Sequence, residues 1–225
     1  MLVSFEHRFI YLKTRKTGST AVEIFFERYC YGPEPYPGPV HYRPQSVTDH
    51  GIIGRRGKKQ PDERWYNHMP AALLRRRLGE EHWERSLKFC VIRNPYEETV
   101  SAFWYFGAKL LADLDPGCTF DAVRQRFAAF VGNPANLVDN RPIYMLGNRL
   151  AVDVVLRHER LPEDVAALAA RLGLPDAHRP LERYKSSYRK RSEPWQEYYT
   201  PEAARMVEAK KAAEFELFDY PKLAI

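Results

Sequence analysis

A turn near the start of the chain carries residue types that bind anions. Residues 11–20 read YLKTRKTGST and combine the positive charge of Lys16 with Gly18 and several hydroxyl side chains. An apolar run at 9–12 predicts a strand before the turn, and apolar side chains spaced i, i+3, i+4 and i+7 over 22–29 predict a helix after it. At such a helix N-terminus, backbone N–H groups and the positive end of the helix dipole attract an anion.

The order of residues in this turn differs from that of a nucleotide-binding P-loop. In the Walker pattern the lysine follows the second glycine, whereas Lys16 here precedes Gly18. Thr17, Ser19 and Thr20 add hydroxyl donors, and Gly18 lets a ligand approach the backbone closely. The turn by itself predicts an anion site and leaves open a basic turn that binds nothing.

A second group of polar residues follows the apolar run at 89–92. Arg93 stands at the predicted carboxyl end of that strand, where open α/β sheets bind their ligands. Its guanidinium suits bidentate contact with a phosphate, and Pro95 suits the first turn of a following helix. Ser101, eight residues after Arg93, has a hydroxyl for the same phosphate. An ion pair between Arg93 and an acid such as Glu97 is the alternative.

Apolar runs and helical patterns alternate along the chain, which sets the expected fold. Runs at 9–12, 89–92 and 152–156 predict strands. The predicted helices are those at 22–29, 69–79, from Pro95, 120–131, 163–172 and from Pro201. This alternation indicates an α/β fold with a central parallel sheet flanked by helices. The proline-rich stretch from 32 to about 66 predicts an irregular insertion in a single domain of residues 1–225.

Composition limits the class of protein. The chain has 225 residues, of which 44% are hydrophobic and 28% charged, as is typical of a soluble globular protein. It has neither an apolar run long enough for a membrane span nor a signal-peptide pattern, and its three cysteines are too scattered for a disulfide framework. We therefore expect a cytoplasmic location. The net charge of +6 suits an anionic ligand, and no nucleic-acid module is recognisable, so we expect no nucleic-acid partner.

Both polar motifs resemble those of sulfotransferases that use 3′-phosphoadenosine 5′-phosphosulfate. Lys-Thr-Gly-Ser-Thr at 16–20 resembles the loop that holds the 5′-phosphosulfate in that family. Arg93-Asn-Pro followed by Ser101 resembles the motif that holds the 3′-phosphate.

Two later segments are similar to the carbohydrate-type group, sulfotransferase family 2. Residues 152–164 resemble its Arg-x-Glu-x-Leu segment with the acidic helix start that follows, and residues 214–220 resemble its Asp-Phe-x-x-Phe-x-Tyr ending. The resemblance extends from about Phe9 to Tyr220 and is weakest in the proline-rich stretch. Glu214 stands where many relatives have Asp, a difference that should affect packing more than chemistry.

The resemblance implies a P-loop-like sulfotransferase fold and a specific chemistry. A sulfuryl group would pass from 3′-phosphoadenosine 5′-phosphosulfate to a hydroxyl of a carbohydrate or small alcohol, leaving adenosine 3′,5′-bisphosphate, without a metal. Lys16 would neutralise the leaving phosphate oxygen. The implied donor-binding residues are Lys16, Thr17, Gly18, Ser19 and Thr20 for the 5′-phosphate, Arg93 and Ser101 for the 3′-phosphate, and Lys185 and Ser187 in a late basic clamp.

His68 is the candidate general base for the acceptor hydroxyl. It precedes a predicted helix, and family 2 enzymes often carry a histidine in this region. An unperturbed histidine pKa near 6.5 suits base catalysis near neutral pH. Asp49, His50 and Glu23 are the reserve candidates, and a histidine that only packs at the helix start is the alternative.

Two other functions fit parts of the pattern. A P-loop-like nucleotide kinase or ATPase would use the same strand–turn–helix, but the Walker order is missing. A non-catalytic module that binds a polyanion would use the basic loops. The aromatic side chains of Trp65, Tyr66, Trp104 and Tyr105 suit either stacking on an acceptor or the core.

Overall fold

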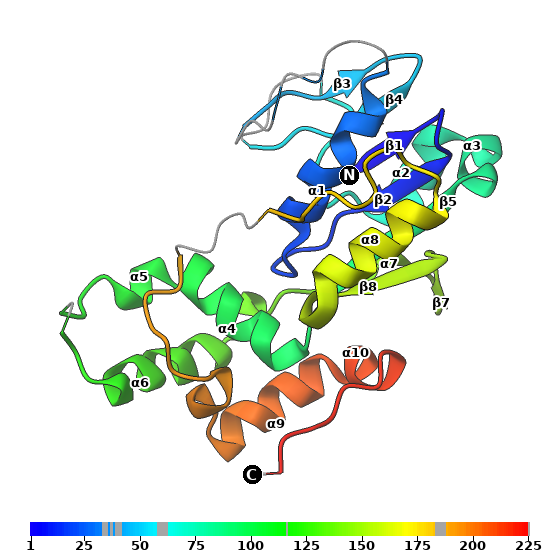
Figure 1. Ribbon diagram of the computed structural model, residues 1–225. Helices are drawn as coiled ribbons and strands as arrows, with labels where there is room; N and C mark the ends of the chain where they lie inside the picture. Colours follow the sequence, from blue (N-terminus) through cyan, green and yellow to red (C-terminus); the bar gives the residue numbers. More distant parts are fainter. Residues whose placement is uncertain are drawn as a thin grey trace. The chain divides into compact units, whose positions relative to one another are not determined.

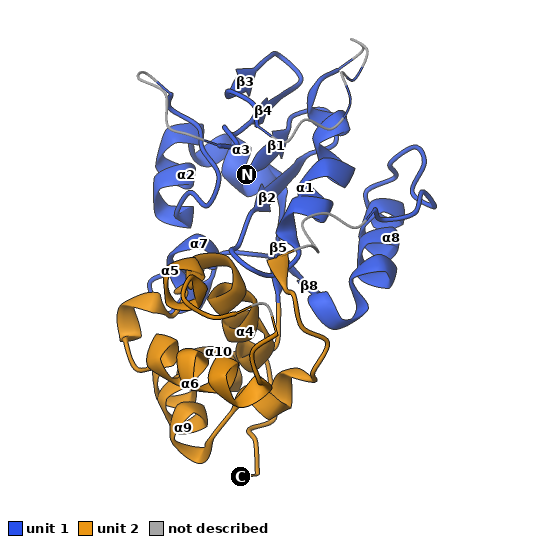
Figure 2. Cartoon of the chain, turned by 90° about the vertical axis from the view of Figure 1, so that its left-hand side faces the viewer, with its two compact units in different colours: residues 1–92, 140–184 blue, residues 93–139, 185–225 orange. Residues whose placement is uncertain are grey.

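The computed structural model describes residues 1–32, 36, 38, 42–57, 63–115, 117–182 and 188–224. The chain forms two compact units, each made of two segments (Figure 2). Unit 1 contains Met1–Ile92 and Asn140–Tyr184, and unit 2 contains Arg93–Asp139 and Lys185–Ile225. The expected single domain stays a prediction.

Unit 1 is built on a six-stranded sheet with the order β3-β4-β1-β2-β5-β8 (Figure 1). The strands are β1 (Leu2–Ser4), β2 (Phe9–Leu12), β3 (Ser46–Val47), β4 (Gly51–Ile53), β5 (Leu87–Ile92) and β8 (Val154–Arg157). Strands β2, β5 and β8 are parallel neighbours, whereas β1, β4 and β3 add to the β2 side by antiparallel pairing. The predicted α/β fold with a central parallel sheet is confirmed. A separate hairpin pairs β6 (Met145–Leu146) with β7 (Arg149–Leu150).

The predicted strands are present, but the antiparallel part of the sheet was not predicted. Strands β3 and β4 fall in the stretch expected to be an irregular insertion. The backbone there also forms two isolated β-bridges, one between Arg43 and Arg56 and one between Arg55 and Tyr66. Strands of two or three residues are too short to show an alternating pattern. Strand β4 forms by pairing with β1, and β3 by pairing with β4, and the local sequence does not reveal these partners.

The core of unit 1 lies between the sheet and two helices. Side chains alternate along a strand, so Phe9, Tyr11, Phe89 and Val91 share one face and are buried. Helices α1 (Ser19–Glu27) and α8 (Leu161–Arg171) pack on that face. Helices α2 (Ala71–Leu78) and α3 (Glu80–Arg85) lie on the other side of the sheet (Figures 1 and 2). Burial on both faces explains why the central strands are continuously apolar.

Unit 2 is helical. Its elements are α4 (Pro95–Phe106), α5 (Ala108–Leu111), α6 (Phe120–Val131), η2 (Pro134–Asn136), η5 (Trp195–Tyr198), α9 (Pro201–Lys210) and α10 (Ala212–Leu217). Its core is aromatic and includes Tyr96, Phe103, Phe127 and Tyr198. The predicted helix starts are confirmed. Thr200, for example, accepts a hydrogen bond from the N–H of Ala203 at 3.2 Å and so caps α9.

The described part of the chain contains no helix long and apolar enough to cross a membrane. It also contains no cluster of three or more His, Cys, Asp or Glu residues arranged to hold a metal ion. Cys30 and Cys90 are free and buried, and burial raises the pKa of both thiols above the usual range.

Candidate functional site

The predicted strand–turn–helix is present, and its backbone has the shape of an anion site. The loop of residues 13–18, called here the anion loop, joins β2 to α1. Gly18 occupies the N-cap of α1 with φ +77°, and Lys16 has φ +62°, whereas Thr17 between them has a negative φ. Where φ alternates in sign along a loop, successive N–H groups can turn toward one concave side, an arrangement known as a nest. The signs of φ at residues 16–18 are therefore those of a nest at a helix N-terminus.

Hydroxyl groups hold the anion loop in place. Thr14 Oγ1 donates to the carbonyl oxygen of Val91 on β5 at 2.6 Å. With that hydrogen committed, the 2.7 Å contact between Thr14 and Thr17 makes Thr17 the donor. Ser19 Oγ donates to the carbonyl oxygen of Thr14 at 2.6 Å. The hydroxyl hydrogens of Thr17 and Ser19 are thus used in hydrogen bonds within the loop. Thr20 is half-buried in the first turn of α1.

A buried charge cluster lies beside the start of the loop. It comprises Glu23 and Glu27 of α1 with Lys13, Arg43 and Arg56. Glu23 receives Lys13 Nζ and Arg56 Nη1 at 2.7 Å each, and Arg43 Nη2 lies 2.8 Å from Glu27. Burial raises the pKa of Glu23, but the surrounding cations outweigh burial and hold it well below the usual range. Glu23 is fully buried and both of its carboxylate oxygens already contact cations, so an acceptor hydroxyl cannot reach it, which removes it from the reserve candidates.

His68 lies against the start of the anion loop. Its Nδ1 is 3.0 Å from the carbonyl oxygen of Lys13, the residue after β2. Because a carbonyl oxygen only accepts, Nδ1 carries the hydrogen and the lone pair lies on Nε2. Burial and then the positive charge of Lys13 lower the pKa of His68 to about 3, so the expected value near 6.5 is wrong. His68 is therefore neutral at physiological pH and able to accept a proton, but a pKa this low makes it a weaker base than an ordinary histidine.

The other two reserve bases lie in the turn between β3 and β4. His50 is half-buried, and its Nδ1 is 3.7 Å from a carboxylate oxygen of Glu6. Asp49 precedes it in the same turn.

Two residues that were not among the predicted site residues contact the anion loop. Asn140 pairs with the backbone of Arg15, and His158 Nδ1 lies 3.2 Å from the carbonyl oxygen of Thr17. His158 follows β8, so its place at a parallel strand's carboxyl end was a usable signal. Asn140 carries no local signal because it lies in neither a motif nor a predicted element.

In unit 2, the first residues after β5 form an ion pair on α4. Arg93 follows Ile92 directly, and its Nε is 3.1 Å from Glu97 Oε2, as the alternative interpretation expected. Asn94 caps the helix by accepting from the N–H of Tyr96 at 3.0 Å. Glu97 and Ser101 are four residues apart and share one face of α4. Arg93 is therefore held one helical turn from Ser101.

The remaining predicted residues are those of the basic clamp and the aromatic side chains considered for acceptor stacking. Lys185 and Ser187 lie outside the described residues. Trp65 and Trp104 are buried and belong to the core, whereas Tyr105 is 38% exposed.

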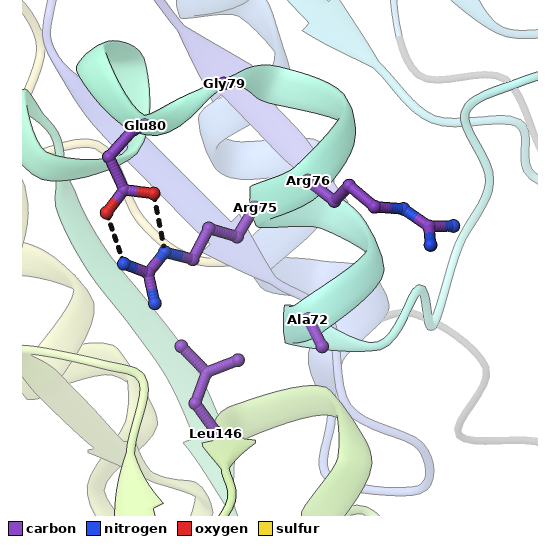
Figure 3. Close-up of a pocket in the computed structure, with 6 residues that line it drawn as sticks. All are labelled: Ala72, Arg75, Arg76, Gly79, Glu80 and Leu146. Carbon is purple, nitrogen blue, oxygen red and sulfur yellow. Dashed lines mark hydrogen bonds and ion pairs between the residues drawn. The ribbon is translucent and has the colours of Figure 1, made fainter.

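A surface pocket on α2 contains none of the predicted site residues. It is lined by Ala72, Arg75, Arg76, Gly79, Glu80 and Leu146 (Figure 3). Arg75 forms an ion pair there with Glu80, and its Nε donates at 3.0 Å. This exposed pair offers no group suited to the predicted chemistry.

Parallel strands, one of which leads through a basic loop into a helix N-terminus, define an α/β protein with a strand–loop–helix at the end of its second strand. The model of the sulfotransferase family matches residues 1–221, and the chain belongs to that family, in its family 2 group. It is therefore a transferase of the sulfotransferase class. Over 109 residues it is 28% identical to an uncharacterized protein of Archaeoglobus fulgidus, a match that covers 48% of this chain and 85% of that relative. No solved structure matches the chain significantly.

Proposed function

We propose that this chain transfers a sulfuryl group from 3′-phosphoadenosine 5′-phosphosulfate to a hydroxyl of a carbohydrate or small alcohol. The observation that carries the proposal is the nest in the anion loop, with Lys16 inside it, at the N-terminus of α1. Membership of the sulfotransferase family supports sulfuryl transfer in general. The donor and the acceptor are the proposed part.

The residues present fit the two phosphate groups of this donor. Gly18 has no side chain to cap α1, so the first N–H groups of the helix are suited to a phosphate. The 5′-phosphosulfate would be held by Lys16, Thr17, Gly18, Ser19 and Thr20. The 3′-phosphate would be held by Arg93 and Ser101, with Arg93 exchanging Glu97 for a more highly charged partner. Lys185 and Ser187 are proposed to close over the nucleotide.

The reaction needs positioning, charge stabilisation and a proton acceptor. The donor supplies the sulfuryl group: the acceptor oxygen bonds to sulfur as the bond from sulfur to the 5′-phosphate oxygen breaks. Lys16 would stabilise the charge that develops on that leaving oxygen. The acceptor proton would pass to Nε2 of His68, the nitrogen that the contact with Lys13 leaves unprotonated.

Backbone strain supports this choice of residues. The described residues include five non-glycine positions with positive φ, and Lys16 and His68 are two of them. Such conformations cost about 1–3 kcal/mol each and are concentrated at functional sites. We also propose a cytoplasmic location, because the cysteines are free thiols, as is usual in a reducing compartment.

One binding experiment separates the three candidate functions. Isothermal titration with adenosine 3′,5′-bisphosphate, ATP and a single-stranded oligonucleotide should show tightest binding of the bisphosphate. Tighter binding of ATP would favour a kinase or ATPase, and preference for the oligonucleotide would favour a polyanion-binding module. Transfer of labelled sulfate from the donor to a panel of sugars and small alcohols then identifies the acceptor class.

A further inference from the structure

The shape of the anion loop depends on a side chain from a distant part of unit 1. Asn140 is buried and forms two hydrogen bonds with the backbone of Arg15. The N–H of Arg15 donates to Oδ1 of Asn140 at 2.8 Å, and Nδ2 of Asn140 donates to the carbonyl oxygen of Arg15 at 3.1 Å. An amide side chain offers a donor and an acceptor side by side, so this pair fixes both peptide groups of Arg15.

Asn140 occupies a helix N-cap but does not cap that helix. It precedes α7 (Arg141–Tyr144), and asparagine is a preferred N-cap because its oxygen accepts from the first turn. Its side chain makes no capping hydrogen bond here, and Oδ1 accepts instead from a residue 125 positions earlier. The side chain therefore serves the anion loop rather than its own helix.

His158 makes a matching contact at the other end of the loop. Its Nδ1 lies 3.2 Å from the carbonyl oxygen of Thr17, and since that oxygen only accepts, Nδ1 is the donor. The ring also lies close to Gly18, where an added Cβ would be 2.7 Å from Nδ1. The imidazole thus fills the space that a side chain at position 18 would need.

These contacts determine where the loop N–H groups point. In a trans peptide, the carbonyl of one residue and the N–H of the next point in opposite directions. Since the Arg15 carbonyl faces Asn140, the N–H of Lys16 points away from Asn140. By the same geometry, the N–H of Gly18 points away from His158. Together with the positive φ of Lys16 and Gly18, this maintains the nest.

We propose that Asn140 and His158 are positioning residues that hold the anion loop in its binding shape before the ligand arrives. They act through the backbone of the loop and do not touch the ligand. The assignment rests on the proposed function in so far as the bound anion is the donor's 5′-phosphosulfate. If the loop has its binding shape for only a fraction of the time, its affinity for the anion falls in proportion to that fraction. Losing either contact should therefore weaken anion binding.

The decisive variant is Asn140→Ala, with Asn133→Ala as its matched control. Asn133 is an exposed asparagine of unit 2 that caps η2 by accepting from Ala135 N–H at 3.1 Å. Arg15 is itself exposed, so water can replace the lost partner and the fold should survive. If the loop is then competent about a tenth of the time, the Kd for adenosine 3′,5′-bisphosphate should rise about tenfold. The KM for the donor should rise with it, and kcat should change little.

Amide hydrogen exchange of the free protein tests the same role without any ligand. In Asn140→Ala the amides of residues 14–19 should exchange faster than in the wild type, while those of the sheet should not change. His158→Phe keeps a ring against Gly18 and removes the hydrogen bond, so it should speed exchange at Gly18 more than at Lys16. Asn140→Asp keeps the size of the side chain but loses the Nδ2 donor to the Arg15 carbonyl, so its loop amides should exchange as fast as those of Asn140→Ala.

The outcomes separate this inference from the proposed function. If the amides of residues 14–19 exchange as slowly in Asn140→Ala as in the wild type, the positioning role is overturned, whatever the nucleotide affinity of the variant. Faster exchange with unchanged nucleotide affinity overturns it too, because the loop would then bind without being held. If the wild type does not bind the bisphosphate, the proposed function fails, and inorganic pyrophosphate becomes the probe. Weaker pyrophosphate binding by Asn140→Ala than by the wild type then supports the positioning role, and equal or absent binding overturns it.

Discussion

The imidazole Nδ1 of His68 lies 3.0 Å from the backbone carbonyl oxygen of Lys13, and this contact joins the candidate base to the start of the anion loop. It fixes the ring's tautomer, because the carbonyl accepts the Nδ1 hydrogen and Nε2 keeps its lone pair. The ammonium group of Lys13 forms an ion pair with Glu23 of α1 at 2.7 Å. One residue thus connects the proposed proton acceptor, the loop and the buried charge cluster.

The rate of sulfuryl transfer should not rise with pH through a histidine pKa near 6.5. Burial and the charge of Lys13 lower the pKa of His68 to about 3, so the ring is already neutral across pH 5–8 and its titration adds no acid limb there. His68→Ala should lower kcat by roughly 10²–10⁴-fold while nucleotide affinity is retained. Activity assays from pH 5 to 8 and binding titrations check both statements. Near-normal kcat in a folded His68→Ala protein would move the base to Asp49 or His50.

The same pKa shift predicts how stability depends on pH. The folded-state pKa of His68, about 3, lies below its ordinary value of 6.5. Between these values the unfolded chain binds more protons, so the free energy of unfolding falls as the pH is lowered from 6.5 toward 3. His68→Gln should make this decline shallower by up to about 1.4 kcal/mol per pH unit. Urea midpoints at several pH values measure the difference, and parallel curves for the two proteins would contradict the prediction.

Lys16 should act mainly in the transition state. Charge on the leaving oxygen develops during transfer, and only contacts that strengthen in the transition state raise turnover. Lys16→Met, which keeps the length and removes the charge, should lower kcat by a larger factor than it raises the Kd for adenosine 3′,5′-bisphosphate. Steady-state kinetics and calorimetry on one preparation compare the two factors. A variant with altered KM and unchanged kcat would make Lys16 a binding residue only.

Arg93 should distinguish nucleotides that carry a 3′-phosphate. Loss of a charge-assisted hydrogen bond costs about 1.5–3 kcal/mol. Arg93→Ala should therefore weaken the binding of adenosine 3′,5′-bisphosphate by that amount and change the binding of adenosine 5′-phosphate little. Arg124→Ala is the control in the same unit, since Arg124 pairs with Asp121 at 2.8 Å on the exposed side of α6. Equal affinity of the wild-type protein for the two nucleotides would remove this assignment.

Glu23 should be more important for stability than any exposed acid. In Glu23→Gln the buried cations Lys13 and Arg56 lose their shared carboxylate, a change that typically costs about 3–5 kcal/mol. Glu81→Gln breaks only the exposed pair with Arg85, at 2.8 Å, and should cost less than about 1 kcal/mol. Urea unfolding of both variants gives the comparison, and similar midpoints would show that the buried cluster contributes little.

Gly18 should be required for the site and not only for its backbone conformation. Alanine in the left-handed region costs about 1–2 kcal/mol. That cost applies equally to Gly173→Ala, where φ is +62° and a Cβ would meet nothing within 4 Å. At Gly18 the Cβ would also press on His158, 2.7 Å away. Gly18→Ala should lose at least as much stability in urea as Gly173→Ala, and only Gly18→Ala should lose affinity for adenosine 3′,5′-bisphosphate; equal affinities would contradict this.

The sequence by itself determined the elements whose signals are local. The runs at 9–12 and 89–92 are apolar because they are buried on both faces of the sheet, and the turns that follow them carry Lys16, Gly18 and Arg93. Residue type and spacing therefore predicted the parallel strands and the place of the anion loop.

Only the tertiary structure decided the properties that depend on distant partners. Asn140 reaches the loop across 125 residues, and neither its neighbours nor its own helix indicates that contact. The pKa of His68 depends on burial and on the charge of Lys13, 55 residues earlier, so no local pattern predicts its fall to about 3. Strands β3 and β4 form because β1 is there to pair with β4, and pairing energy between separate segments leaves no periodic trace in either of them.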